Sequence, residues 1–246
     1  MNTVLFDLDG TLLPMKMEEY METYIKSFKA YLSNKGYDSE KIMKGFWIGV
    51  DAVSNNDGFL TNEECFWKAF ENFMCPSEKK MPPREKHKLE RAITKFYNTD
   101  YDVARFNTRP TAYAKECIDI LKEKGYGVVI ATNPFYPEVA ITKRLEWAGI
   151  YEDDYILATT YENSCFCKPD LNYYRHILQT IDKDPEDCLM VGNDVNEDMC
   201  AFKIGMDVFL LDECLINTKH EDTSEYKRGK WEHFRLFVEE LPSIEY

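Results

Sequence analysis

The sequence predicts an α/β fold in which a Rossmann-like parallel sheet lies between two layers of helices, with an all-helical domain inserted into it. Three observations predict this three-layer arrangement: a short apolar strand near the N-terminus, a long helical stretch directly after it, and helices that alternate with short apolar strands in the second half of the chain. We therefore expect a core formed by residues 1–14 and 106–246, and a helical domain formed by residues 15–105.

The first strand ends in two carboxylates. Val4 to Phe6 form an apolar run typical of a buried strand, and Asp7 and Asp9 follow it, one residue apart. Because strand side chains alternate between faces, both acids start out on the same side, and Gly10 then permits a sharp turn. Two like charges this close are costly unless a divalent cation or a shared proton lies between them. Taken alone, the stretch also fits an ordinary strand followed by an Asp-Gly turn.

Residues 15–105 repeat apolar side chains every three or four positions, as helices do. Gly36 marks the end of a first helix, Ser39 can cap a second, and Arg84 to Asp100 form the last. The helical pattern fills this whole interval, so we expect the inserted domain to be all-helical.

A third helix of the insertion begins at a capping box, Thr61 to Glu64, which follows a turn at Asn55 to Gly58. A calcium loop is the alternative, since Gly58 and Glu64 would stand at its sixth and twelfth positions. The first position would then be Val53, which cannot bind calcium, so the turn and capping box are favoured.

From Pro110 the pattern alternates between helices and strands, which indicates a parallel sheet. We expect helices at 114–125, 139–149, 172–181 and 199–204, strands at 128–131, 155–158, 188–191 and 208–211, and a closing helix at 231–241. The strand at 208–211 is expected to be the last, and residues 218–230 are the one stretch compatible with disorder.

The composition limits which kinds of partner the protein can bind and in which cellular compartment we expect it. The formal charge is −14 and the pI about 4.8, a field that repels nucleic acid and anionic membranes. No apolar run approaches the ~20 residues of a membrane span, and the polar motif at Asp7 leaves no room for a signal peptide. Eight scattered cysteines fit reduced thiols better than a disulfide framework. We expect a cytoplasmic protein.

Polar residues follow every expected strand, and in an open parallel sheet ligands bind at the carboxyl ends of the strands. These residues are, in order along the chain, Asp7, Asp9, Gly10 and Thr11, then Thr132 and Asn133, then Lys168, Pro169 and Asp170, then Gly192, Asn193, Asp194 and Asp198, and last Asp212 and Glu213. Each of these groups alone is weak evidence for a binding site. Together they suit a magnesium ion, which prefers hard oxygen ligands, and a phosphoryl group, which lysine binds as a point charge. The hydroxyl of Thr132 and the N–H of Asn133, near an expected helix start at Pro137, can bind phosphoryl oxygens.

At this point the chain resembles the haloacid dehalogenase-like hydrolases. It carries their four motifs in order: Asp7-Leu8-Asp9-Gly10-Thr11, then Thr132, then Lys168, then Gly192-Asn193-Asp194 with Asp198. The resemblance covers residues 1–13 and about 108–215, and it implies a phosphatase-type member. The helical insertion is similar to the type-one cap of the family, although no specific motif matches inside it.

The resemblance implies the following chemistry. Asp7 would attack phosphorus and form an aspartyl-phosphate. Asp9 would protonate the leaving oxygen and then activate the water that releases phosphate. Lys168 and Thr132 would bind the transferring oxygens. The expected reaction is magnesium-dependent hydrolysis of a phosphomonoester.

The resemblance also implies a metal site. Magnesium would be held by the Asp7 carboxylate, the backbone carbonyl of Asp9 and the Asp194 carboxylate. The fourth motif departs from the simplest family form, because Asn193 follows the glycine where an acid usually stands. This leaves open whether Asp194 or Asp198 is the inner-sphere ligand. We favour Asp194, with Asp198 binding through water or orienting the lysine.

Other readings of the motifs remain open. The acid at Asp9 favours phosphate esters over dehalogenation or phosphonate cleavage, but phosphomutases keep it too. A catalytically silent phosphate-binding protein is a further alternative. A phospho-acceptor module similar to a receiver domain is disfavoured, because receivers are about half this length and lack the insertion. The cap implies a small phosphorylated metabolite, which the sequence does not identify. Phe46 and Trp47 are expected to pack within the cap rather than reach the site, and the oligomeric state cannot be read.

Overall fold

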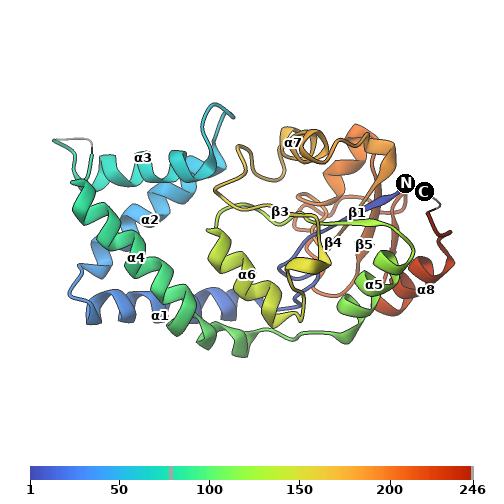
Figure 1. The fold of residues 1–246 in the computed structure, drawn as a ribbon, viewed down its shortest axis with the longest axis horizontal. Helices are drawn as coiled ribbons and strands as arrows, with labels where there is room; N and C mark the ends of the chain where they lie inside the picture. Colours follow the sequence, from blue (N-terminus) through green and yellow to red (C-terminus); the bar gives the residue numbers. More distant parts are fainter. Residues whose placement is uncertain (78–79, 245–246) are drawn as a thin grey trace.

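The computed structural model describes residues 1–77 and 80–244. Six parallel strands form one sheet in the order β3-β2-β1-β4-β5-β6, and a block of helices extends from one side of it (Figure 1). The strands are β1 (Thr3–Phe6), β2 (Gly127–Ile130), β3 (Leu157–Ala158), β4 (Cys188–Gly192), β5 (Asp207–Leu211) and β6 (Lys227–Gly229). The predicted α/β class, with a parallel sheet and an inserted helical block, is confirmed.

Twelve helical elements surround the sheet within the described residues. The α-helices are α1 (Met17–Asn34), α2 (Ser39–Ser54), α3 (Asn62–Met74), α4 (Pro83–Thr99), α5 (Ala112–Glu123), α6 (Glu138–Trp147), α7 (Leu171–Ile181) and α8 (Trp231–Glu240). The short 3-10 helices are η1 (Asp100–Asn107), η2 (Glu152–Asp154), η3 (Pro185–Asp187) and η4 (Met199–Ile204).

Strand β1 lies at the centre of the sheet, between β2 and β4. Its alternate side chains face different helices. Val4 and Phe6 join one hydrophobic cluster with α5 and α8, whereas Leu5 joins a second cluster with α7 and η4. Figure 1 shows α7 on one side of the sheet and α5 and α8 on the other. Burial on both faces explains why Val4 to Phe6 are all apolar up to the carboxyl end of the strand, where the polar residues begin.

The helical block is held together by aromatic side chains. Tyr24 and Phe28 on α1 pack against Phe96 and Tyr97 on α4, with the Phe28 and Phe96 rings 4.8 Å apart. These residues recur at the helical spacing that the sequence shows, and all four are buried. The capping box predicted at the start of α3 is present, because Thr61 accepts from the Glu64 N–H while the Glu64 carboxylate accepts from the Thr61 N–H.

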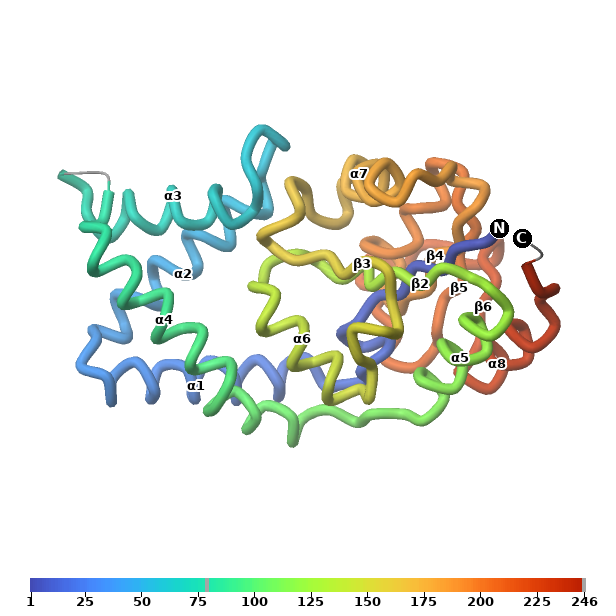
Figure 2. Tube along the Cα trace, viewed as in Figure 1, coloured from blue at the N-terminus to red at the C-terminus, as the bar shows by residue number. Residues whose placement is uncertain are grey.

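Two connections join the block to the sheet. The chain enters it near Met15 and leaves near Thr108, and these two residues form an isolated antiparallel bridge. Figure 2 shows the two connecting segments leading into the block from the end of β1 and back out toward α5. The base of the block is thereby fixed beside the carboxyl end of β1.

A second part of the block, the start of α3, also contacts the sheet domain. Asn62, the first residue of α3, is fully buried, and its backbone N–H donates to the carbonyl of Ser164 at 2.8 Å. Its side-chain amide donates to the carbonyls of Pro134 and Phe166, at 3.3 Å each. One residue of the helical block thus bonds to the loops that follow β2 and β3.

Three expectations for the second half of the chain need correction. The strand at 208–211 is not the last, because β6 pairs with β5 inside the stretch 218–230, which had been expected to be the candidate for disorder. Strand β3 is shorter than the predicted 155–158, whereas the short helix expected at 199–204 is confirmed and is of the 3-10 type. None of the helices in the described part of the chain combines the length and apolar character needed to cross a membrane.

Candidate functional site

A pocket of about 260 Å³ opens at the carboxyl ends of β1, β2 and β4. We call it the site pocket. It is lined by Asp7, Asp9, Met17, Tyr20, Thr132, Asn133, Phe135, Tyr136, Asn193, Asp194, Glu197, Asp198 and Ile216. The carboxylates lie at its strand-end side, whereas most of the other lining residues are aromatic or aliphatic. The structure therefore brings together the polar groups predicted from the ends of strands one, two and four.

Lys168 links two of these carboxylates. Its ammonium lies 2.9 Å from Asp7 Oδ1 and 2.6 Å from Asp198 Oδ1, and its side chain is 1% exposed. Burial alone would lower the pKa of this lysine, but Asp198 and Asp7 together raise it well above its usual value, so the ammonium stays charged. Burial raises the pKa of Asp198, and Lys168 opposes that rise. Lys168 is thus a fixed positive charge beside Asp7.

Asp9 is paired with an arginine that comes from α6. Its Oδ2 accepts from Nη1 of Arg144, whose side chain is 0% exposed. The guanidinium carbon also lies 4.4 Å from the centre of the Tyr136 ring, and Nε donates to the carbonyl of Ala140. Burial raises the pKa of the Asp9 carboxyl; Arg144 opposes this, and the charge of Asp7 adds to it, leaving the pKa above its usual value. The two acids that follow β1 therefore have different partners.

Thr132 and Asn133 follow β2 at the edge of the site pocket. The Thr132 carbonyl accepts from the hydroxyls of Thr159, at 2.6 Å, and Tyr173, at 2.9 Å, so hydrogen bonds hold this loop rigidly. The Asn133 amide donates to Glu197 Oε2 at 3.0 Å. The helix start expected near Pro137 is confirmed, because Pro137 is the N-cap of α6, but Asn133 lies before it, in the loop after β2.

The residues after β4 interlock with the loop after β1. Asn193 accepts a hydrogen bond of 2.8 Å from Thr11, and its amide packs against Gly10, where an added Cβ would lie 2.6 Å from the Asn193 nitrogen. Gly10 also has a φ of +94°, which favours glycine. At Gly192, a Cβ would stand 2.1 Å from an Asp198 oxygen. Both glycines are thus required by close approach, and Asn193 serves to join the two loops.

The donor set of the site pocket fits magnesium bound together with a phosphate. Asp7, Asp9 and Asp194 line one pocket and offer hard oxygen atoms. In residues 1–77 and 80–244, no three His, Cys, Asp or Glu side chains are grouped closely enough to hold a metal ion unaided. Magnesium is usually held by one or two carboxylates, with water and substrate oxygens completing its shell. Asp194 is held in place by N–H groups of its own turn, Asn196 at 2.8 Å and Glu197 at 2.9 Å.

The two acids that follow β5 lie outside the site pocket. Asp212, after β5, pairs with Arg228 on β6, and Glu213 accepts from the N–H of Trp231, so these acids take part in local structure instead. In the helical block, Phe46 packs against other rings of the block, as expected, and does not line the pocket.

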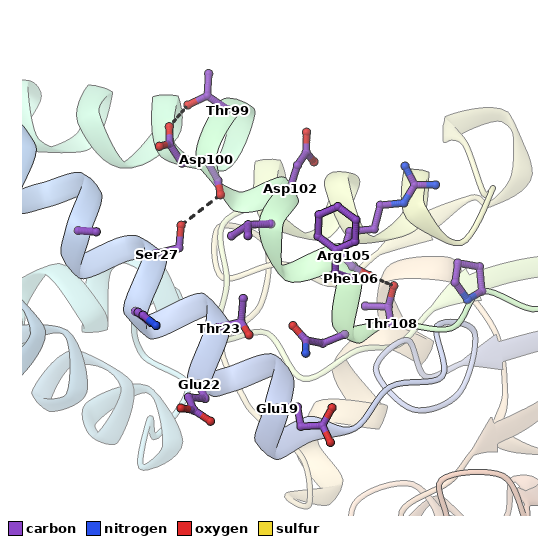
Figure 3. A pocket seen from close by; sticks show the side chains of 15 residues that line it. Glu19, Glu22, Thr23, Ser27, Thr99, Asp100, Asp102, Arg105, Phe106 and Thr108 are labelled. Carbon is purple, nitrogen blue, oxygen red and sulfur yellow. Dashed lines mark hydrogen bonds between the residues drawn. The ribbon is translucent and has the colours of Figure 1, made fainter.

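A larger hollow, about 1310 Å³, lies between α1 and η1 at the base of the block (Figure 3). Its lining mixes acids such as Glu19 and Asp100 with Arg105 and the exposed ring of Phe106. None of the residues predicted for chemistry lines it, so size alone does not mark the site.

Sequence reasoning missed two charged residues of the site, Arg144 and Glu197. A signal for Arg144 existed, because it lies three residues after Ile141 and four before Ala148, on the buried stripe of its helix. A charged residue on such a stripe needs a partner. Burial raises the pKa of Glu197, and Lys168 opposes the rise. The sequence offered no comparable sign for this acid, which follows Asp194 in a turn.

Comparisons with known proteins agree with the fold. The family model described as haloacid dehalogenase-like hydrolase matches residues 1–204. The pyrophosphatase PpaX of Bacillus thuringiensis is 27% identical over 194 residues, which span 78% of this chain and 74% of that protein. All four sequence motifs and strands β1 to β4 lie within the residues that the family model matches.

Solved structures resemble the whole chain. A HAD phosphatase from Thermococcus onnurineus matches with a TM-score of 0.57 at 16% identity, over 99% of this chain and 100% of that one. The HAD-hydrolase YfnB from Bacillus subtilis, described as bound to magnesium, matches with a TM-score of 0.54 at 16% identity, over 97% and 98%. At these identities the structures show a shared fold. The family match extends across all four motifs and most of the chain, and with it we conclude that this protein is an enzyme of the haloacid dehalogenase-like hydrolase family.

Proposed function

We propose that this protein is a phosphatase that hydrolyses a small phosphomonoester through an aspartyl-phosphate on Asp7, with magnesium as cofactor. The observation that carries the proposal is the arrangement around Asp7, whose carboxylate lies in the site pocket 2.9 Å from a fully buried lysine. A carboxylate held beside a fixed positive charge suits attack on an anionic phosphoryl group, because the lysine offsets the repulsion between them.

In the first step an Asp7 oxygen forms a bond to phosphorus, and the bond between phosphorus and the leaving oxygen breaks. Asp9 gives its proton to that oxygen, so the product leaves as an alcohol. In the second step a water oxygen attacks phosphorus, its proton passes to Asp9, and the Asp7–phosphorus bond breaks to release inorganic phosphate. Lys168, with Thr132 and Asn133 at the edge of the pocket, binds the phosphoryl oxygens.

Magnesium, when bound, would neutralise charge between the nucleophile and the phosphoryl group. Asp7, Asp194 and the backbone carbonyl of Asp9 are the groups that we assign to it. Asp198 has two other partners, the Lys168 ammonium and the N–H of Asp194 at 2.9 Å. We therefore assign Asp198 to orienting Lys168, in preference to direct metal binding.

We further propose that residues 15–105 are the cap domain and that residues 1–14 and 106–246 are the catalytic core. Met17 and Tyr20 of the cap line the site pocket, together with Phe135, Tyr136 and Ile216 from the core. This largely apolar rim suits an organic leaving group. It is less suited to pyrophosphate, whose leaving group is itself charged, although pyrophosphate is the substrate named for the PpaX relative.

A substrate panel tests the proposal. Purified protein is incubated with phosphomonoesters, p-nitrophenyl phosphate and pyrophosphate, with magnesium or with EDTA, and phosphate release is measured. We expect magnesium-dependent release from at least one phosphomonoester, faster than from pyrophosphate. Asp7→Asn should lower turnover by about 10³-fold or more, as loss of a nucleophile does. Asp153→Asn, at an exposed acid on η2, is the matched control. Near-normal turnover by the Asp7 variant, or no release by the wild type, would refute the proposal.

A further inference from the structure

The ion pair between Arg144 and Asp9 distinguishes the two oxygens of the Asp9 carboxylate. The two residues are 135 positions apart in the chain, and the arginine comes from α6, a helix that supplies none of the four family motifs. One carboxylate oxygen of Asp9, Oδ2, is held by Nη1 of Arg144. The other, Oδ1, is buried without a hydrogen-bond partner among the described residues, while Asp9 itself lines the site pocket. The pairing thus occupies one oxygen of Asp9 and leaves the other without a hydrogen-bond partner.

Arg144 is itself held on several sides. Its Nε donates to Ala140 one turn earlier on α6, at 3.3 Å, and its guanidinium lies over the ring of Tyr136. The side chain is 0% exposed. A planar guanidinium fixed by a backbone carbonyl and an aromatic face has little rotational freedom, so the carboxylate bonded to it has little as well.

We propose that Arg144 is a positioning residue, which fixes the side chain of Asp9 so that its unengaged oxygen can exchange a proton with the leaving group. The inference rests on the proposed phosphatase function. Asp9 stands on the turn after β1, and its side chain could otherwise rotate about its own bonds. Proton transfer needs the acid within hydrogen-bond reach of the oxygen it protonates, so an acid held in one orientation is more effective than a mobile one.

The test uses three substrates that release phenols of rising pKa: 2,4-dinitrophenyl, p-nitrophenyl and phenyl phosphate. The dinitrophenolate leaves readily without a proton, whereas phenolate does not, so an effect exerted through Asp9 must grow along the series. Arg144→Met removes the guanidinium and keeps the bulk of the stem. We expect kcat/KM to fall less than about threefold for the dinitrophenyl ester and about 10²-fold for the phenyl ester, the size of a lost general acid. Lys143→Met, on the same helix and paired with Glu146, is the matched control.

Arg144→Met leaves Asp9 as an unpaired buried charge, which can impair folding. A comparison with a double variant avoids this problem. Asp9→Asn removes that charge. Adding Arg144→Met to Asp9→Asn should change kcat/KM for the phenyl ester by less than about twofold, because the residue through which Arg144 acts is already absent. A crystal structure of Arg144→Met should show Asp9 in a different or a divided orientation.

The outcomes separate the two proposals. If the wild type releases no phenol from any of the esters, the phosphatase function fails. If it does, an equal loss of kcat/KM for all three esters in Arg144→Met, or a further large loss on top of Asp9→Asn, overturns the positioning role alone. An unchanged Asp9 side chain in the crystal structure of the variant overturns the positioning role whatever the activity.

Discussion

Asn62 gives a specific prediction about stability, because this single side chain of the helical block bonds to the loops that follow β2 and β3. Its amide nitrogen donates to the carbonyls of Pro134 and Phe166, and its oxygen accepts from Asn56 at 2.8 Å. A net contribution of about 1 kcal/mol for each of these three bonds predicts that Asn62→Ala lowers the free energy of unfolding by about 3 kcal/mol. Asn98→Ala, at an exposed asparagine on α4, should change it by less than about 0.5 kcal/mol.

The isosteric variant Asn62→Asp separates hydrogen bonding from packing. Aspartate has the same shape but only acceptors, so it would face two carbonyl oxygens and carry a buried charge, and we expect a larger loss than for alanine. Urea unfolding measures all three variants. Because the contacted carbonyls belong to the loops that carry Asn133 and Lys168, kcat/KM should also fall, by about tenfold or more. The reasoning is refuted if Asn62→Asp is as stable as the wild type, or if Asn62→Ala loses no more than Asn98→Ala.

Two further predictions concern the sheet domain. Burial raises the pKa of Asp154, but hydrogen bonds from Lys122 and from a backbone N–H outweigh it, so the pKa is lowered. Ionised Asp154 therefore stabilises the fold by about 1–3 kcal/mol. This stabilisation is present at pH 7 and is lost as the pH falls below about 4. In urea unfolding, the free energy of unfolding of Asp154→Asn should equal that of the wild type at pH 2–3 and be lower at pH 7. Phe234 is fully buried, and its ring centre lies 4.9 Å from that of Phe209. Phe234→Ala should therefore lower the free energy of unfolding by about 3–5 kcal/mol. Leu236→Ala, at an exposed position of the same helix, should cost less than about 0.5 kcal/mol in the same unfolding assay.

The fold could be predicted because its main elements are specified by local patterns. The strands β1, β2 and β4 are short apolar runs buried on both faces, and burial of that kind leaves a continuous apolar run in the sequence. Strand β6 could not be found in this way. It consists of Lys227, Arg228 and Gly229 at the edge of the sheet, and it is a strand because it pairs with β5. Edge strands are often charged, so their sequence carries little sign of the pairing.

The site could be predicted where each residue directly follows a strand. Parallel strands bring their carboxyl ends to one edge of the sheet, so Asp7, Thr132 and Asp194 were expected together without knowledge of any helix. Arg144 lies on a helix, and its approach to Asp9 depends on how α6 packs on the sheet. That packing is set by tertiary contacts that no local pattern specifies.

The balance of charge in the site explains why the proposed mechanism needs a cation. Five carboxylates line the site pocket, whereas Lys168 and Arg144 are the two cations that contact them in the part of the chain the structure describes. Each cation is already engaged, Lys168 with Asp7 and Asp198, and Arg144 with Asp9. A phosphate ester would therefore enter a pocket with excess negative charge in a protein of formal charge −14. Protonation of buried acids offsets part of this excess, and a divalent cation shared by Asp7, Asp194 and the phosphate offsets more while leaving the nucleophile ionised. The pair of acids after β1 thus finds its positive partners in three places: a lysine from the loop after β3, an arginine from α6, and the proposed magnesium ion.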